Sequence, residues 1–393
     1  MKYEAIIVGG GVVGASLALL LGQAGMRICL LDKGSPSRVQ QTDLFKGKTA
    51  SLNLASIEVF KKLGIWEKVD QYSKEFTNIE VWDSEGSSAI TFNAQDISKT
   101  KLGKVAHNNN IISSLFDLLQ KLSTVDLLEN ESVLSINNGE ELIEIKTDSG
   151  LNLTANLVVG SDGSMSSIRS LSSIPIRTWS YEQTAIVSLL ESEIPINKTA
   201  YQIFTSTGPI ALLPVTVEGE NLTSLIWSAD KVYAEKLLSL EDSEFLEELK
   251  LKTEGKLGHF KIREAISSFP LHQLHAKEYF SERTVLVGDS AHTIHPLAGQ
   301  GLNLGLSDVI DLSERILSLR REGRDIADEQ MLKAYSDSRE KINLRMTALM
   351  EVFKRGFGSK NPWVKLGRNL AFSVANETKF LKKKFIKEAA GIT

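Results

Sequence analysis

The chain has 393 residues, of which 42% are hydrophobic and 24% are charged, and its net charge is −4. This composition excludes collagen-like, low-complexity and wholly disordered chains, the small net charge gives no sign of nucleic-acid binding, and the length predicts roughly two to three domains. The only cysteine, Cys29, lies in an apolar run, which excludes a disulfide framework and a multi-cysteine metal or iron–sulfur site. We expect it to be a buried thiol in a strand.

The first 32 residues predict a βαβ unit. Tyr3 to Val8 is an apolar run typical of a buried strand, Val12 to Gly25 has the small-residue pattern of a helix that ends on glycine, and Arg27 to Asp32 is a second strand. Between the first strand and the helix, Gly9, Gly11 and Gly14 form a GxGxxG motif.

Each glycine of this motif has a physical reason. The first permits a tight turn, the second lets a pyrophosphate approach the backbone, and the third lets the helix pack on the strand. The helix N-terminus then holds the anion. Asp32 ends the second strand, where its carboxylate can accept hydrogen bonds from a ribose. The motif predicts a dinucleotide site but does not distinguish FAD from NAD.

The remaining elements indicate one domain built from separated pieces and a second, sheet-rich domain. Alternating apolar residues predict a largely antiparallel sheet, and buried strands and helices are predicted elsewhere. The sheet covers 76–92 and 184–227, the further strands 153–160 and 285–287, and the helices 111–122, 302–321 and the region from 331 onward, with a break at Pro362. Strands that end in glycine and acidic turns recur near residues 9, 160 and 288, which favours a single domain of three segments.

Two more motifs follow such strand ends. The first, from Gly160 to Arg169, reads D-G-x-x-S-x-x-R, and the second runs from Gly288-Asp289 through His295-Pro296 to Asp308. With these residues the sequence resembles the group A flavoprotein monooxygenases, the family of para-hydroxybenzoate hydroxylase. The run from His295 to Asp308 resembles in particular the signature of the ubiquinone-biosynthesis hydroxylases, and similar segments extend over nearly the whole chain.

The resemblance implies an α/β fold, α+β overall. A Rossmann-like FAD-binding domain would be assembled from 1–75, 98–175 and 277–340, a mixed or antiparallel substrate-binding sheet from 76–97 and 176–276, and a basic helical segment from 341–393. It also implies FAD as cofactor, NAD(P)H as transient reductant and O₂ as co-substrate. The reaction would be hydroxylation of an aromatic ring through a flavin hydroperoxide, with a polyprenylated phenol of ubiquinone biosynthesis as the expected substrate.

The resemblance also assigns residues. Asp289 would bond the ribityl chain, and backbone N–H groups at Gly299, Gly301 and Leu302 would face the pyrimidine end of the flavin. His295 and Pro296 would shape the wall beside the ring, and no catalytic base or metal ligand is assigned. The full set of expected cofactor-binding residues is Gly9, Gly11, Gly14, Asp32, Lys48, Asp162, Arg169, Gly288, Asp289, Pro296, Gly299, Gly301, Leu302 and Asn303.

Two places depart from the family pattern. Lys48 stands where arginine is usual, which keeps the charge but loses the bidentate fork. His107-Asn108-Asn109 stands where E-N-R is frequent.

Other interpretations of the same residues remain open. The protein is alternatively a related flavin enzyme for a soluble aromatic or a secondary metabolite, or a non-catalytic escort of prenylated proteins. His292 and His295 have the spacing of metal ligands but no carboxylate or cysteine cluster beside them. Five aromatic side chains are candidates either for a substrate pocket or for the core: Trp82, Trp179, Trp227, Phe204 and Phe269.

The end of the sequence is basic. Residues 331–393 carry 14 Lys and Arg against 5 Asp and Glu, a net +9, which leaves −13 for the rest. Lys379, Lys382, Lys383, Lys384 and Lys387 cluster among apolar side chains and form either a solvated face or a contact with anionic lipid. No run approaches the ~18 apolar residues of a membrane-spanning helix, and Ala5 to Val8 is too short for a signal peptide. We expect a cytoplasmic location, with peripheral membrane contact, a biosynthetic complex and a homo-oligomer as options.

Overall fold

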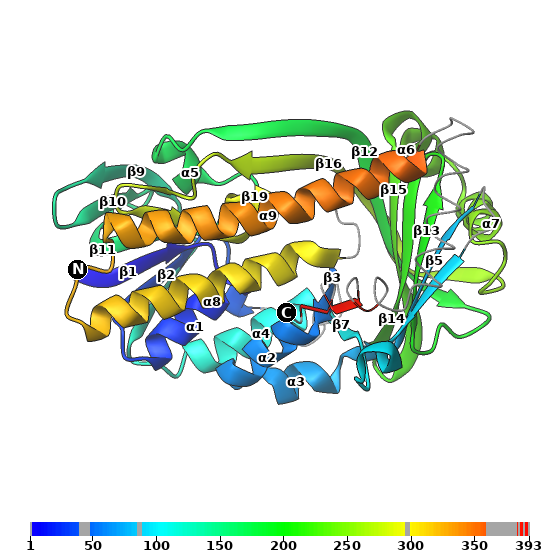
Figure 1. The fold of residues 1–393 in the computed structure, drawn as a ribbon, viewed down its shortest axis with the longest axis horizontal. Helices are drawn as coiled ribbons and strands as arrows, with labels where there is room; N and C mark the ends of the chain where they lie inside the picture. Colours follow the sequence, from blue (N-terminus) through cyan, green and yellow to red (C-terminus); the bar gives the residue numbers. More distant parts are fainter. Residues whose placement is uncertain are drawn as a thin grey trace.

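The computed structural model describes residues 2–38, 48–84, 89–294 and 299–358, together with 383, 386, 387, 390 and 391. Figure 1 shows an elongated molecule with one large sheet at each end and long helices along its length.

The first sheet contains the predicted βαβ unit. Its strands follow the order β17-β18-β11-β1-β2-β8, and β10 and β9 continue from β11. The pairs among β18, β11, β1, β2 and β8 are parallel, which suits their apolar runs, because both faces of a parallel sheet are buried. The bounds are β1 Lys2–Val8, β2 Ile28–Asp32, β8 Val125–Glu129, β9 Val133–Asn138, β10 Ile143–Thr147, β11 Asn152–Gly160, β17 Phe280–Ser281 and β18 Thr284–Leu286.

Helices cover this sheet. α1 packs against both α4 and α8, and α9 lies against α8 (Figure 1). The small and apolar residues of α1 are buried almost throughout, as expected for a helix enclosed by neighbours. The bounds are α1 Val12–Gln23, α4 Asn108–Leu119, α5 Ser167–Leu171, α8 Gln300–Arg321 and α9 Glu329–Gly358.

The second sheet has the order β19-β16-β12-β15-β14-β13-β5-β6, and all its pairs are antiparallel except β13 with β5. β12 and β16 extend along the molecule toward the first sheet (Figure 1). α6 and α7, which the sequence analysis did not identify, cover this sheet and bury Phe245 against Trp227. The bounds are β5 Asn78–Asp83, β6 Ala89–Asn93, β12 Ile176–Ser192, β13 Thr199–Thr205, β14 Gly208–Val217, β15 Glu220–Asp230, α6 Lys231–Leu238, α7 Asp242–Lys252, β16 Phe260–Ala276 and β19 His292–Thr293.

A small antiparallel sheet lies between the two large ones. Its order is β3-β7-β4, and α2 follows directly on β3. The bounds are β3 Thr49–Asn53, α2 Leu54–Leu63, α3 Trp66–Gln71, β4 Lys74–Phe76 and β7 Gly103–His107, and the short 3₁₀ helices are η1 Pro36–Arg38, η3 Ala94–Ile97 and η4 Gly288–Ser290.

The mixed α/β fold class is confirmed, and Cys29 is buried in β2. The division into domains stays a prediction, although α9 continues without a break through its boundary at 340 and 341. Within the described part of the chain, no helix has the length and apolar character needed to cross a bilayer. Lys383 and Lys387 are exposed, whereas Pro362, Lys379, Lys382 and Lys384 lie outside the described residues.

Candidate functional site

The first two motifs are in contact through their glycines. A Cβ atom on Gly9 would lie 2.4 Å from the carbonyl oxygen of Ser161, and one on Gly14 would lie 2.0 Å from the carbonyl oxygen of Gly9. Gly9 also has a φ of +111°, which side chains disfavour. The hydroxyl oxygen of Ser161 lies 2.9 Å from the carbonyl oxygens of both Val8 and Gly9, to which the hydroxyl donates. These contacts require glycine at both positions.

The third motif packs against the other two. Gly305 has no room for a side chain, since its Cβ would lie 2.8 Å from a methyl group of Val13 and 3.3 Å from the Cα of Gly288. Ser290 donates a 2.6 Å hydrogen bond from Oγ to the carbonyl of Gly160. Segments around residues 9, 160 and 288 therefore meet at the carboxyl ends of β1, β11 and β18, where ligands bind in open α/β sheets.

Gly11 differs from the other two glycines of its motif. A Cβ on Gly11 would have no described atom within 4 Å, so the backbone borders open space. Gly11 is the N-cap of α1, and no described side chain caps this helix or places an acid in its first turn. The free N–H groups and the helix dipole at this end suit a pyrophosphate.

Asp32 lies beside this helix end. Its two carboxylate oxygens accept hydrogen bonds from the backbone N–H of Gly10 at 2.5 Å and of Gly34 at 2.7 Å. Because a carboxylate oxygen can accept more than one hydrogen bond, Asp32 is held in place and can still accept bonds from a ribose.

Asp162 and Arg169 are engaged within the protein. Asp162 accepts from the backbone N–H groups of Ser167 and Ile168 at the start of α5. The buried guanidinium of Arg169 donates to the carbonyl of Ser290 at 2.8 Å and to that of Ser164 at 2.8 Å. Arg169 thus joins the second motif to the third, and burial lowers its pKa. Whether either side chain also meets a cofactor stays a prediction.

Asp289 and the start of α8 form the second open region. The Asp289 side chain is exposed, and a Cβ on Gly301 would lie 4.0 Å from its Oδ1. Surrounding protein desolvates the carboxylate and raises its pKa, while His292, Lys48 and His272 act against this rise.

The N-terminus of α8 resembles that of α1. Gly299 is the N-cap, has a φ of +60°, and leaves the helix without a described side-chain cap. Gly301 and the half-buried Leu302 follow in the first turn. This end therefore also offers backbone N–H groups to an acceptor.

Asn303 uses its side chain to connect elements. Its Oδ1 accepts from the backbone N–H of Asn53 at 3.0 Å and from the hydroxyl of Ser56 at 2.7 Å. Its Nδ2 donates to the carbonyls of Ser51 and Gly299, at 2.8 and 3.2 Å. The amide therefore links the β3–α2 junction to the first turn of α8.

The two departures from the family pattern lie side by side. Thr49, next to Lys48, pairs with His107 in the β3–β7 ladder, and the N–H of Asn108 donates to the carbonyl of Lys48 at 3.0 Å. The ammonium of Lys48 lies 4.5 Å from the ring centroid of the half-buried Phe269 on β16. A cation and an aromatic face of the second sheet thus meet near Asp289.

The other four aromatic candidates differ in their exposure to solvent. Trp82, Trp227 and Phe204 are buried, and the first two belong to the core beneath α6 and α7. Trp179 is exposed. Among the five, Phe269 is the one placed by contact beside a predicted cofactor residue.

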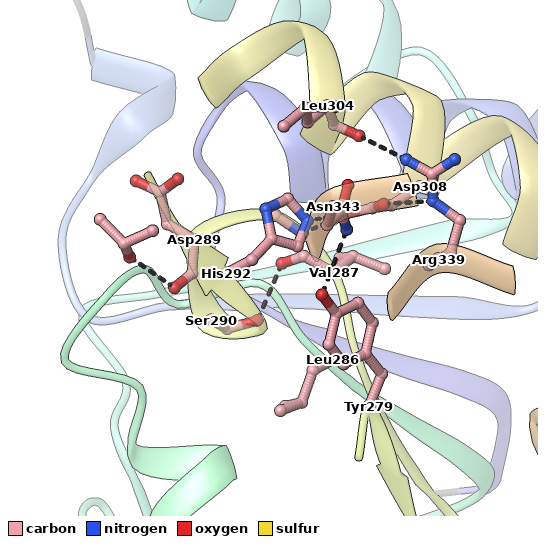
Figure 2. Close-up of polar contacts among 12 residues, drawn as sticks. Tyr279, Leu286, Val287, Asp289, Ser290, His292, Leu304, Asp308, Arg339 and Asn343 are labelled. Carbon is pink, nitrogen blue, oxygen red and sulfur yellow. Dashed lines mark hydrogen bonds and ion pairs between the residues drawn. The ribbon is translucent and has the colours of Figure 1, made fainter. Parts of the chain in front are cut away.

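A buried polar network, which sequence reasoning did not assign, supports η4 (Figure 2). Asp308 accepts from Nε2 of His292 at 2.6 Å, from Nε of Arg339 at 2.6 Å and from the backbone N–H of Gly288 at 2.9 Å. Burial alone would raise the pKa of Asp308, but the charges and hydrogen bonds of His292 and Arg339 hold it below its ordinary value. Asp308 and His292 belong to the third motif, whereas nothing in the sequence indicated Arg339.

A second group of hydrogen bonds, around Tyr279, packs against this network through the stacked rings of Tyr279 and His292. The Tyr279 hydroxyl lies 3.0 Å from Nε2 of His275 and accepts from Nδ2 of Asn343 at 3.2 Å. Burial lowers the pKa of His275 to about 4, so this imidazole is neutral at pH 7. His295 and Pro296 lie outside the described residues, and within the described part no group of three His, Cys, Asp or Glu residues is arranged to hold a metal.

Comparison with known proteins decides the family. A sequence model of the family described as "FAD binding domain" matches residues 2–349. The chain belongs to this family. In sequence it is 30% identical over 390 residues to the 3-demethoxyubiquinol 3-hydroxylase of Escherichia coli, covering 99% of this chain and 98% of that protein. It is 29% identical to the "Ubiquinone biosynthesis monooxygenase COQ6, mitochondrial" of Dictyostelium discoideum, covering 99% and 91%.

Solved structures show the same fold. The p-nitrophenol 4-monooxygenase PnpA of Pseudomonas putida superposes with a TM-score of 0.80 at 19% identity, over 99% of this chain and 98% of that one. Membership of the FAD-binding family identifies FAD as the cofactor. The two uncapped helix ends, the open space at Gly11 and the accessible carboxylates of Asp32 and Asp289 fit a long molecule with a central diphosphate.

Proposed function

We propose that the protein is an FAD-dependent monooxygenase that uses NAD(P)H and O₂ to hydroxylate the aromatic ring of a ubiquinone precursor. The observation that carries the proposal is the meeting of three glycine motifs around two open helix N-termini. The full-length similarity to proteins named as ubiquinone hydroxylases and monooxygenases supports the substrate class.

Each open group has a proposed role. The N–H groups of α1 at Gly11 bind the pyrophosphate and Asp32 accepts from the ribose. Asp289 accepts from the ribityl hydroxyls, and the first turn of α8 faces the pyrimidine end of the flavin. Bound FAD would supply the redox chemistry, in which two electrons from NAD(P)H are consumed, one oxygen atom of O₂ enters the ring and the other leaves as water.

The chain's own residues supply position and charge. A helix N-terminus beside the flavin stabilises the negative charge of its reduced state. Lys48 contacts Phe269 on β16 of the second sheet. We assign residues 76–97 and 176–276, which include this sheet, to substrate binding. Residues 1–75, 98–175 and 277–340 are assigned to FAD binding. The exposed Lys383 and Lys387 support peripheral contact with an anionic membrane, on the cytoplasmic face, as the way to a polyprenylated substrate.

The test is the reaction of the purified protein. We expect a flavin spectrum, consumption of NADH or NADPH that depends on a short-chain demethoxyubiquinol analogue, and one oxygen atom from labelled O₂ in the product. A protein that gains no flavin absorbance after addition of FAD would support the escort alternative. Flavin binding with turnover of soluble phenols only would support the secondary-metabolite alternative.

A further inference from the structure

Two described residues near the end of the sequence, Ile386 and Ala390, are held in the protein by packing. Ile386 and Ala390 are each 3% exposed, and Ile386 belongs to the apolar cluster that includes Phe76, Val105 and Val215. Lys383 and Lys387 on the same segment are exposed. In Figure 1 the red segment near the C-terminus lies beside β7. Ile386 is therefore buried beside the small central sheet, whereas Lys383 and Lys387 face solvent.

The end of this segment contacts the junction between β3 and α2. The carbonyl of Ala390 accepts from the N–H of Leu54, the first residue of α2, at 3.2 Å. This N–H is one of the four that a helix leaves without an internal partner. Gly391 has a φ of +69°, and a Cβ there would lie 2.8 Å from Nδ2 of Asn53 and 2.9 Å from the Cβ of Ala55. The close approach thus requires glycine.

The opposite side of the same junction holds α8. The N–H of Asn53 donates to Oδ1 of Asn303 at 3.0 Å, and Asn303 donates to the carbonyl of Gly299 at 3.2 Å. Asn53 therefore contacts Gly391 through its side chain and Asn303 through its backbone. Two residues, Asn53 and Asn303, therefore connect Gly391 to Gly299 at the start of α8.

We propose that Ile386, Ala390 and Gly391, which we call the strap, set the position of the α8 N-terminus against the flavin ring through their contacts with Asn53 and Leu54 and, beyond these, through Asn303. The residues of the strap are positioning residues, since none is placed against cofactor or substrate. This inference rests on the proposed function only in that it takes the first turn of α8 as part of the flavin site.

The experiment compares two glycines with the same backbone conformation. Gly391→Ala introduces both strain and a collision with Asn53, whereas Gly255→Ala, at a φ of +66°, introduces strain with no described atom within 4 Å of the new Cβ. We expect Gly391→Ala to raise the dissociation constant of FAD roughly three- to tenfold, the scale of one weakened hydrogen bond. Gly255→Ala should leave this constant unchanged at a comparable loss in melting temperature.

A second readout separates positioning from stability. At saturating FAD, the visible circular dichroism of the flavin should change in Gly391→Ala and in Ile386→Ala, and should return to the parent spectrum in the conservative variant Ile386→Val. If the parent protein binds no FAD, the flavin site itself is wrong. If the parent binds FAD and Gly391→Ala matches it in both dissociation constant and dichroism, the strap has no positioning role and the inference is overturned.

Discussion

Asp308 and Arg339 form an ion pair inside the protein, with 2.6 Å between Oδ1 and Nε, although 31 residues separate them in the sequence. Asp308 is fully buried and Arg339 is 3% exposed. The pair joins α8 to α9, and the second oxygen of Asp308 holds His292 and the N–H of Gly288. The position of η4, and with it of Asp289, therefore depends on a charge pair behind the site.

The first prediction concerns this pair. Asp308→Asn leaves the buried guanidinium of Arg339 without its counter-charge, so we expect a loss of about 3–5 kcal/mol in the free energy of unfolding. Asp311→Asn is the matched control, because Asp311 pairs with Arg315 at 2.7 Å on the same helix in a partly exposed setting. That change should cost less than about 1 kcal/mol. Denaturant unfolding of both variants measures the difference, and equal losses would contradict the role given to Asp308.

The second prediction is a pH dependence from His275. Its pKa is about 4 in the folded protein, against roughly 6.5 in an unfolded chain. Between these values the unfolded state binds more protons, so stability falls as the pH decreases from 6.5 to 4. The loss attributable to this group is at most about 3 kcal/mol.

His275→Gln should remove this part of the pH dependence, whereas His259→Gln, at an exposed histidine, should leave it unchanged. Unfolding free energies measured from pH 7 to pH 4.5 test both variants. If the free energy of unfolding of His275→Gln changes with pH as steeply as that of the parent, other groups cause the pH dependence.

The third prediction uses two glycines of one motif. Gly14→Ala should destabilise the fold and abolish FAD retention, because the new Cβ would lie 2.0 Å from the carbonyl of Gly9. Gly11→Ala has free space and an ordinary backbone φ of −65°, so the melting temperature without FAD should stay at the parent value. The methyl group would nevertheless occupy the approach to the pyrophosphate and weaken FAD binding. A Gly11→Ala protein with parent affinity would remove the pyrophosphate from this helix end.

The fourth prediction concerns Asp289. Asp289→Ala should weaken FAD binding by about 1.5 to 3 kcal/mol, the range for hydrogen bonds to a charged group. Asp337→Ala, in a surface pair with Lys333, is the control and should leave the affinity unchanged. Flavin fluorescence titration gives both constants, and equal affinities would exclude the ribityl contact.

The fifth prediction concerns the basic tail. Replacing Lys382, Lys383 and Lys384 by Gln should weaken sedimentation with anionic vesicles, because each cation near such a surface contributes about 1 kcal/mol. High salt should weaken binding of the parent, since screening acts over roughly 8 Å at physiological ionic strength. The control replaces the exposed Lys61, Lys62 and Lys68, which changes the charge equally. The tail would be only a solvated face if the parent protein did not bind anionic vesicles at low salt. The same conclusion would follow if the control variant bound the vesicles as weakly as the tail variant.

Local patterns were sufficient for β1, β2, β11 and β18 of the first sheet and for its glycines, but they did not indicate β8, β9, β10 or β17. The run from Tyr3 to Val8 and the spacing of Gly9 and Gly14 predict a strand, a turn and a close approach, and the structure places all three there. These features depend on neighbours in the sequence and on the shape of one residue type.

The partners of polar side chains could not be predicted in this way. The expected cofactor contact of Arg169 stays a prediction, whereas one of the two carbonyls that it binds belongs to Ser290, 121 residues away, which no local pattern indicated. Asn303 and Arg339 likewise bind groups that only the folded chain brings near. Hydrogen-bond partners over such distances follow from topology, and the sequence of one protein contains no periodic signal for them.

The paired strands β12 and β16 restrict how this protein can change during evolution. They stay in register from Ile176 with Ala276 to Ser192 with Phe260, apart from irregularities that include the one between Ser180 and Gln183. A one-residue deletion in either strand turns every following side chain to the opposite face. The β16 end also places His275 opposite His292, next to Asp308. Insertions and deletions in these strands should therefore be restricted to the existing irregularities, where extra residues already interrupt the ladder.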